Sequence, residues 1–186
     1  MYKKILIISL FALFVVSGCK KDSQLDEDCE KIEDYLSENG DKDFLFYRDN
    51  SMFRHRSEND SDFEQTMPAI EKYNNTYCRM IKEGDGEQFV AGDSIAILYR
   101  TALLSNPNKA IDSCLVKAFE AFTETTVSGS GSLLAGVQYG LTTMKVGGKS
   151  VFYIPSSLAY GSESIGGETY ANLVFYCELL AIIHKK

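Results

Sequence analysis

The sequence is poor in the residues that usually build metal and nucleophilic sites. Its 186 residues include only two histidines, His55 and His184, and neither has a second ligand-type residue at the helical spacing of a metal site. No sequence signature of serine–histidine catalysis is present. The five cysteines form no CxxC pair, which argues against the common zinc and dithiol redox motifs. The chain also has three prolines and no tryptophan. We therefore predict no metal and no cofactor.

Basic charge is scarce as well. The formal net charge is −7 at pH 7, and 19 of the 26 acidic residues lie within residues 20–90, against 10 Lys and Arg in the same stretch. General nucleic-acid binding depends on Lys and Arg that neutralise phosphates, so we expect no nucleic-acid partner. The hydrophobic fraction of 45% excludes a wholly disordered chain, and the length suits one globular domain with additional segments.

Two short motifs resemble nucleotide and cation sites but are incomplete. The GKS run at 148–150 would need a glycine at position 143 to form a phosphate-binding loop, and Thr143 stands there. The acidic run at 41–62 has no glycine at the sixth position of a calcium loop. We interpret the acidic run as solvated surface.

The first eighteen residues have the pattern of an export signal. Two lysines precede an apolar run at 5–16, and VSGC follows at 16–19. Twelve helical residues rise about 18 Å, well short of the roughly 30 Å hydrocarbon core of a bilayer. VSGC resembles a bacterial lipobox, which implies that residues 1–18 are removed and that Cys19 carries the acyl chains of a membrane anchor. We expect the protein in the bacterial cell envelope, on the periplasmic face of the outer membrane.

An acidic tether and N-terminal extension is predicted over residues 19–76. Its first part, 20–28, is polar and is interpreted as a tether. Apolar residues at helical spacing predict a short helix over 27–38 that stops at Asn39-Gly40. Short strands are predicted at 44–47 and 52–53, with a solvated loop at 58–64.

Residues 77–186 are predicted to form the main domain. Strand-like segments occur at 77–81, 94–104, 110–116, 150–154 and 173–183, and an apolar stripe with two small residues, Gly136 and Gly140, predicts a helix over 132–143. Several strands with one internal helix and no regular alternation indicate an α+β fold with an antiparallel sheet. Cys29, Cys78, Cys114 and Cys177 are left without an assigned pairing, and Cys177 is expected to be a buried free thiol.

An ordered series of motifs runs through this domain. The motifs are GDG at 84–86, GDSIAILY at 92–99, IDS at 111–113, GLTTMKVGGK at 140–149, IPSSLAYG at 154–161 and LVFYCELL at 173–180. In composition, order and approximate spacing they resemble an FKBP-type peptidyl-prolyl cis-trans isomerase. The resemblance covers residues 84–183 and implies a twisted antiparallel sheet wrapped around one short helix, with a pocket between them.

The resemblance also implies the residues of the pocket. Catalytic positions would be Tyr99, Asp112, Tyr160 and Phe175, and substrate-binding positions would be Ile111, Leu133, Leu134, Val137 and Ile165. One aromatic residue from the 119–122 segment, Phe119 or Phe122, would join them. The partners implied are proline-containing segments of unfolded exported proteins. The extension is a candidate for homodimer formation, although nothing in residues 20–76 indicates it.

Three departures from the family pattern predict weak activity. The family places a tryptophan at the pocket floor, where this chain has Val137, and an aromatic residue where it has Ile111. The loop at 162–172 is short and has no proline. Two functions therefore stay open: a membrane-anchored isomerase that assists folding, and a catalytically weak or inactive peptide-binding module.

Overall fold

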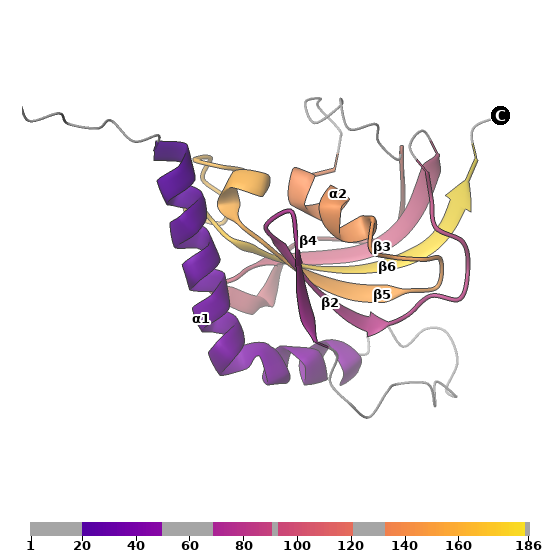
Figure 1. Ribbon diagram of the computed structural model, residues 1–186, viewed down its shortest axis with the longest axis horizontal. Coiled ribbons are helices and arrows are strands. Elements are labelled where there is room, and N and C mark those ends of the chain that lie inside the picture. The colour runs from indigo at the N-terminus through magenta and orange to yellow at the C-terminus, as the bar shows by residue number, and fades with distance from the viewer. Residues whose placement is uncertain (1–19, 50–68, 91–92, 121–132, 185–186) are drawn as a thin grey trace, which may run out of the picture.

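The computed structural model describes residues 20–49, 69–90, 93–120 and 133–184, and its centre is an antiparallel sheet (Figure 1). The six strands are β1 (Ile70–Tyr73), β2 (Thr76–Lys82), β3 (Ser94–Leu103), β4 (Asn106–Glu120), β5 (Lys149–Ile154) and β6 (Leu173–Ile183). They lie in the order β1-β2-β5-β6-β3-β4. The helices are α1 (Lys20–Asp49), α2 (Ala135–Leu141) and a short 3-10 helix, η2 (Ser156–Leu158). The predicted α+β class with an antiparallel sheet is confirmed.

Each face of the sheet supports its own hydrophobic core. On β5, Phe152 and Ile154 point to the face that carries α2, whereas Val151 and Tyr153 point to the face that carries α1. Successive side chains of a strand alternate between faces, so both faces of the central strands are apolar. We call the cluster around Phe152 the α2-side core and the cluster around Tyr153 the α1-side core.

The helix α2 lies unusually close to β5. A Cβ placed on Gly136 would collide with the side chain of Ile154, and one on Gly140 would lie 2.6 Å from the ring of Phe152. Both glycines therefore permit the close approach that the sequence predicted. The helix covers residues 135–141 and is shorter than the predicted 132–143.

The helix α1 differs most from the sequence prediction. It begins at Lys20, so the stretch 20–28 is helical rather than a loose tether, and it runs past Asn39-Gly40 to Asp49. A glycine costs about 1 kcal/mol in a helix, which does not by itself end one. Residues 44–47, predicted as a strand, belong to this helix. A stripe of Cys29, Ile32, Tyr35 and Leu36 packs on the α1-side core, and Ile32 has no exposed surface. The helix therefore continues through the predicted stop, and the buried stripe fixes its preceding turns on the sheet.

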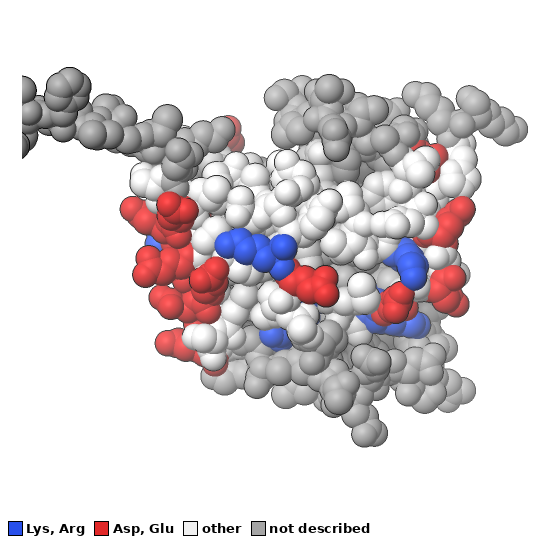
Figure 2. All heavy atoms as spheres, viewed as in Figure 1, with Lys and Arg blue, Asp and Glu red and all other residues white. Residues whose placement is uncertain are grey.

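The outward side of α1 is acidic. Figure 2 shows red side chains gathered along the edge of the molecule where α1 lies. The exposed acidic residues of this helix are Asp26, Glu27, Glu30, Glu33, Asp34 and Glu38. The helix is thus amphipathic, with its apolar stripe on the sheet and its charges in solvent.

The strand predictions are confirmed in most places. The segment 173–183 coincides with β6, and 77–81, 94–104 and 150–154 fall within one residue of β2, β3 and β5. Strand β4 is longer than the predicted 110–116, since it starts at Asn106 and continues to Glu120. The hairpin of β1 and β2 was not predicted, and its turn residues Asn74 and Asn75 both have positive φ. The predictions for 52–53, 58–64, Cys19 and Phe122 lie outside the described residues.

In the described part of the chain, no helix has the length and apolarity needed to cross a bilayer. The four cysteines there, Cys29, Cys78, Cys114 and Cys177, are free thiols. Cys177 is fully buried, as expected from its apolar segment, and burial raises its pKa.

Candidate functional site

All nine residues predicted from the resemblance lie on the face of the sheet that carries α2. They come from β3 (Tyr99), β4 (Ile111, Asp112), the start of α2 and the residues just before it (Leu133, Leu134, Val137), the segments after η2 (Tyr160, Ile165) and β6 (Phe175). The eight apolar and aromatic members belong to or pack on the α2-side core. The sheet therefore brings together residues that are up to 76 positions apart.

A row of stacked aromatic rings forms the centre of the candidate site. The rings of Tyr99 and Phe175, on neighbouring strands, have centroids 5.2 Å apart and planes 10° apart. Phe175 also stacks on Phe152, at 6.3 Å and 4°. Phe152 is fully buried beneath Gly140, so it supports the other two rings from below. The resemblance did not assign Phe152 to the site, although its alternation on β5 marks it as facing the same core.

The carboxylate of Asp112 contributes to raising the pKa of both tyrosines of the site. The Tyr99 hydroxyl donates a hydrogen bond to Oδ2 of Asp112 at 2.8 Å. Burial and this hydrogen bond raise the pKa of Tyr99. Burial and the negative charge of Asp112 also raise the pKa of Tyr160. Both phenols therefore stay protonated and can act as hydrogen-bond donors over the physiological pH range.

The Tyr160 hydroxyl is the polar group left available for a ligand. Tyr160 is half-buried, and within the described ranges its hydroxyl has no hydrogen-bond partner. Tyr99, in contrast, is committed to Asp112. A half-buried phenol with an unused donor, beside an apolar surface, is suited to bind a carbonyl oxygen.

The helix α2 presents a backbone donor to the same region. Leu134 is the N-cap of this helix, and its carbonyl accepts the N–H of Gln138 at 3.0 Å. The N–H of an N-cap residue has no partner within the helix. Leu133 and Leu134 are both half-buried against the α2-side core. Leu134 thus offers an apolar side chain and a backbone donor at one place.

Val137 has no exposed surface. It lies in the α2-side core, on a helix that the close approach of Gly136 and Gly140 presses onto β5. The position is therefore packed, and it supports the aromatic row without an open face of its own.

The short loop at 162–172 is folded down onto the strands beside the site. Ile165 and Glu168 exchange two backbone hydrogen bonds, of 2.9 and 3.1 Å, across a turn in which Gly166 and Gly167 have positive φ. The Cα of Gly166 comes so close to β3 that a Cβ would lie 2.9 Å from the side chain of Leu103. Ile165 packs on the α2-side core near this point. The loop therefore supplies an apolar rim without proline.

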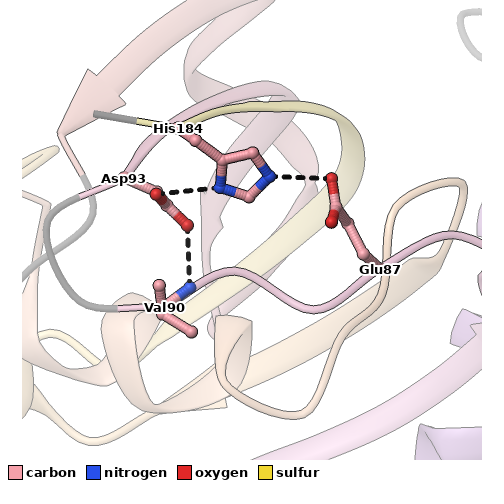
Figure 3. Close-up of polar contacts among 4 residues, drawn as sticks. All are labelled: Glu87, Val90, Asp93 and His184. Carbon is pink, nitrogen blue, oxygen red and sulfur yellow. Dashed lines mark hydrogen bonds and ion pairs between the residues drawn. The ribbon is translucent and has the colours of Figure 1, made fainter. Parts of the chain in front are cut away.

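A separate polar cluster lies at the end of β6. The ring of His184 binds Asp93 through Nδ1 and Glu87 through Nε2, each at 3.0 Å (Figure 3). Asp93 is buried and also accepts the N–H of Val90 at 3.0 Å. The hydrogen bonds to Glu87 and Asp93 raise the pKa of His184. Both ring nitrogens are thus occupied by carboxylates. Among the described residues no group of three His, Cys, Asp or Glu is placed to hold a metal ion.

A groove of about 600 Å³ lies elsewhere, between α1 and the end of the 162–172 loop. Its lining includes Lys31, Tyr35, Glu168 and Tyr170. None of the nine predicted residues contributes to it. The groove is therefore distinct from the candidate site on the α2 side.

Comparison with known proteins agrees with this geometry. A family model described as FKBP-type peptidyl-prolyl cis-trans isomerase matches residues 86–180. An FK506-binding protein of Neisseria meningitidis serogroup B is 36% identical over 104 residues, which are 55% of this chain and 91% of that protein. An FK506-binding protein of Streptomyces anulatus is 31% identical over 105 residues, covering 55% of this chain and 82% of that protein.

Two solved structures share the fold. A peptidyl-prolyl cis-trans isomerase from Pseudomonas syringae pv. tomato aligns with a TM-score of 0.55 at 18% identity, over 90% of this chain and 99% of that one. FkpA from Escherichia coli aligns with a TM-score of 0.52 at 21% identity, over 87% of this chain and 64% of that one. The region matched by the family model extends from just before β3 into β6 and includes α2 and all nine candidate residues. The chain therefore belongs to the family of FKBP-type peptidyl-prolyl cis-trans isomerases.

Proposed function

We propose that this chain catalyses cis-trans isomerisation of X-Pro bonds in exported proteins, with the proline ring on the α2-side aromatic row. The observation that carries the proposal is the arrangement of Tyr99, Asp112 and Tyr160 beside Phe175. It combines a stacked apolar surface, a fixed carboxylate and an unused phenol donor. These are the components that the reaction needs, and no nucleophile is among them.

The mechanism is stabilisation of a twisted amide. An X-Pro bond isomerises through a state that has lost amide resonance, against a barrier of roughly 18–20 kcal/mol. An apolar surface favours this less polar state by removing the amide from water. The Leu134 N–H and the Tyr160 hydroxyl would each donate a hydrogen bond to a carbonyl of the peptide, while Asp112 holds Tyr99 against Phe175. Such fixed groups favour the transition state by geometry and environment.

The test is a proline-peptide isomerisation assay on the full chain purified in detergent. The wild-type protein should accelerate isomerisation above the uncatalysed rate. Tyr160→Phe should lower kcat/KM roughly 2- to 10-fold, the scale of one lost hydrogen bond. Tyr170→Phe is the matched control, because Tyr170 is 45% exposed and lies near the end of the same loop. Equal rates for both variants would refute the assignment of Tyr160.

The second candidate function is a peptide-binding module with little or no catalysis. It is favoured by Val137, which is fully buried where the family resemblance implies an indole beneath the proline. Titration with a proline peptide separates the two functions. Saturable shifts of the Tyr99 and Tyr160 resonances without rate acceleration would establish the binding module.

A lipid anchor on Cys19 is part of the proposal. It is supported by the short apolar run at 5–16 and by VSGC at 16–19. Two or more acyl chains give stable attachment to a membrane. The location that we propose with this anchor is the cell envelope, on the periplasmic face of the outer membrane, where exported chains fold.

A further inference from the structure

Asp28 of α1 is a fully buried carboxylate that binds the segment leading to Tyr160. Its Oδ2 accepts hydrogen bonds from the backbone N–H of Ser156, at 2.9 Å, and from the Ser156 hydroxyl, at 2.5 Å. Both residues have no exposed surface. A buried charge is retained only where hydrogen bonds compensate its lost hydration, and Ser156 supplies two of them. The third comes from the side chain of Gln24, which donates to Oδ1 at 2.9 Å.

Asn172 closes the same network from the other end of the loop. Its Oδ1 accepts the Ser156 N–H at 3.0 Å, and its Nδ2 donates to the backbone carbonyl of Asp28 at 3.3 Å. Its own carbonyl accepts the N–H of Leu104 at 2.8 Å. Residues 156 and 172 are therefore fixed to one point on α1. The chain between them carries Tyr160 and Ile165, two residues of the candidate site.

Ser156 of this network also holds the turn that carries Tyr160. The carbonyl of Ser156 accepts the N–H groups of Ala159, at 2.9 Å, and of Gly161, at 2.8 Å. These two amides lie immediately before and after Tyr160. A displacement of Ser156 would therefore move the backbone on both sides of the tyrosine.

We propose that Asp28 is a positioning residue for the isomerase site, acting through Ser156 to hold Tyr160 and the 162–172 loop in their binding geometry. The proposal rests on the proposed function. It assigns α1 to the active machinery, although this helix lies outside the segment matched by the family model and on the opposite face of the sheet.

The kinetic consequence is specific. Tyr160 donates to a peptide carbonyl in the proposed mechanism, so a misplaced Tyr160 weakens peptide binding and raises KM. A purely structural defect would instead lower the folded fraction, and hence the apparent kcat, without changing KM. Asp28→Ala should raise KM roughly 2- to 10-fold, up to the loss expected when the Tyr160 hydroxyl is removed outright.

Three further variants of the full chain separate positioning from folding. Asp28→Asn should restore most of the wild-type KM, because its carbonyl oxygen can accept both Ser156 donors while Gln24 rotates its amide. Gln24→Ala removes the partner of Oδ1 only and should leave KM unchanged. Ile32→Ala, one turn along the same buried stripe, weakens the docking of α1 without touching Ser156 and should also leave KM unchanged. A raised KM in Ile32→Ala equal to that in Asp28→Ala would overturn the proposal.

Amide hydrogen exchange tests the same coupling without an activity assay. In Asp28→Ala the amides of Leu158, Ala159 and Gly161 should exchange about tenfold faster, while those of β6 keep wild-type protection. Unchanged exchange at these three amides would overturn the proposal even if the protein is an active isomerase. If these amides exchange faster in Asp28→Ala but the wild-type chain shows no isomerase activity, the proposed function is refuted and the structural coupling stays in place.

Discussion

Replacement of Val137 by tryptophan distinguishes two explanations for the missing indole. Either the site is open and lacks an aromatic surface, or the core is packed around the smaller valine. The family resemblance alone predicts that Val137→Trp restores an aromatic surface beneath the proline and raises kcat/KM. The structure predicts the opposite, because Val137 has no exposed surface and α2 cannot move closer to β5. The indole must displace neighbours such as Phe152 or Leu141.

The expected size follows from the packing. Overfilling a packed core costs about 1–3 kcal/mol. For a domain of about this length each 1 kcal/mol lowers Tm by roughly 2–4 °C, so Val137→Trp should lower Tm by roughly 2–12 °C. Disturbance of the Phe152–Phe175 stack should at the same time leave kcat/KM equal to or below that of the wild type.

The assay combines thermal unfolding with proline-peptide turnover on the full chain. Tyr139→Trp is the matched control, because it introduces the same indole into the same helix at a half-buried position with room toward solvent. It should keep Tm within a few degrees of the wild type. An unchanged Tm together with a higher kcat/KM in Val137→Trp would refute the reasoning, since the position would then open toward the substrate.

Three other predictions follow from the site, the His184 cluster and the N-terminus. Asp112→Ala should lower kcat/KM while changing Tm by only a few degrees, because Asp112 is exposed and its partner Tyr99 stays packed on Phe175. A large fall in Tm with unchanged turnover would contradict the role of Asp112 in the site. His184 has a raised pKa in the folded state, so its contribution to stability should be complete below its unfolded pKa of about 6.5 and should disappear as the pH rises through the folded value. The measurement is the free energy of unfolding in urea for the wild type and His184→Gln between about pH 5.5 and 8.5. A difference between the two proteins that grows with pH would exclude this linkage. Cys19→Ser should release the protein from the membrane fraction or leave an unprocessed precursor, and a mature protein that stays in the membrane fraction would rule out the anchor.

The sheet and α2 could be predicted from sequence because their signals are local. Ten of the eleven residues of β6 are apolar, with a β-type composition, and its predicted ends match the structure. Gly136 and Gly140 repeat on one side of an apolar stripe, which is the pattern of a helix packed closely on a sheet. The family motifs predict the candidate site residues, and the apolar and aromatic ones among them lie together on the α2-side core.

The helix α1 could not be delimited in the same way. Its residues 20–28 are mostly polar, and a buried Asp28 has the same sequence signature as an exposed one. Its distant partners, Ser156 and Asn172, make that position favourable, and a local sequence pattern does not show them. The Asn39-Gly40 pair is only a weak helix stop, and the helix continues through it to Asp49. The hairpin at Asn74-Asn75 had a local signal, since two consecutive residues that tolerate positive φ favour a tight turn.

Under the proposed acylation of Cys19, the start of α1 at Lys20 would set how far the sheet reaches from a membrane. A flexible nine-residue tether over 20–28 would extend roughly 15–18 Å and let the domain reorient freely. The helix instead advances about 1.5 Å per residue, so Asp28 lies only about 12 Å along a rigid axis from the residue that follows Cys19. In a chain acylated at Cys19, the sheet is then carried as one body with its anchor. Under the proposed function, its substrates would then be polypeptide segments within a thin layer next to the lipid.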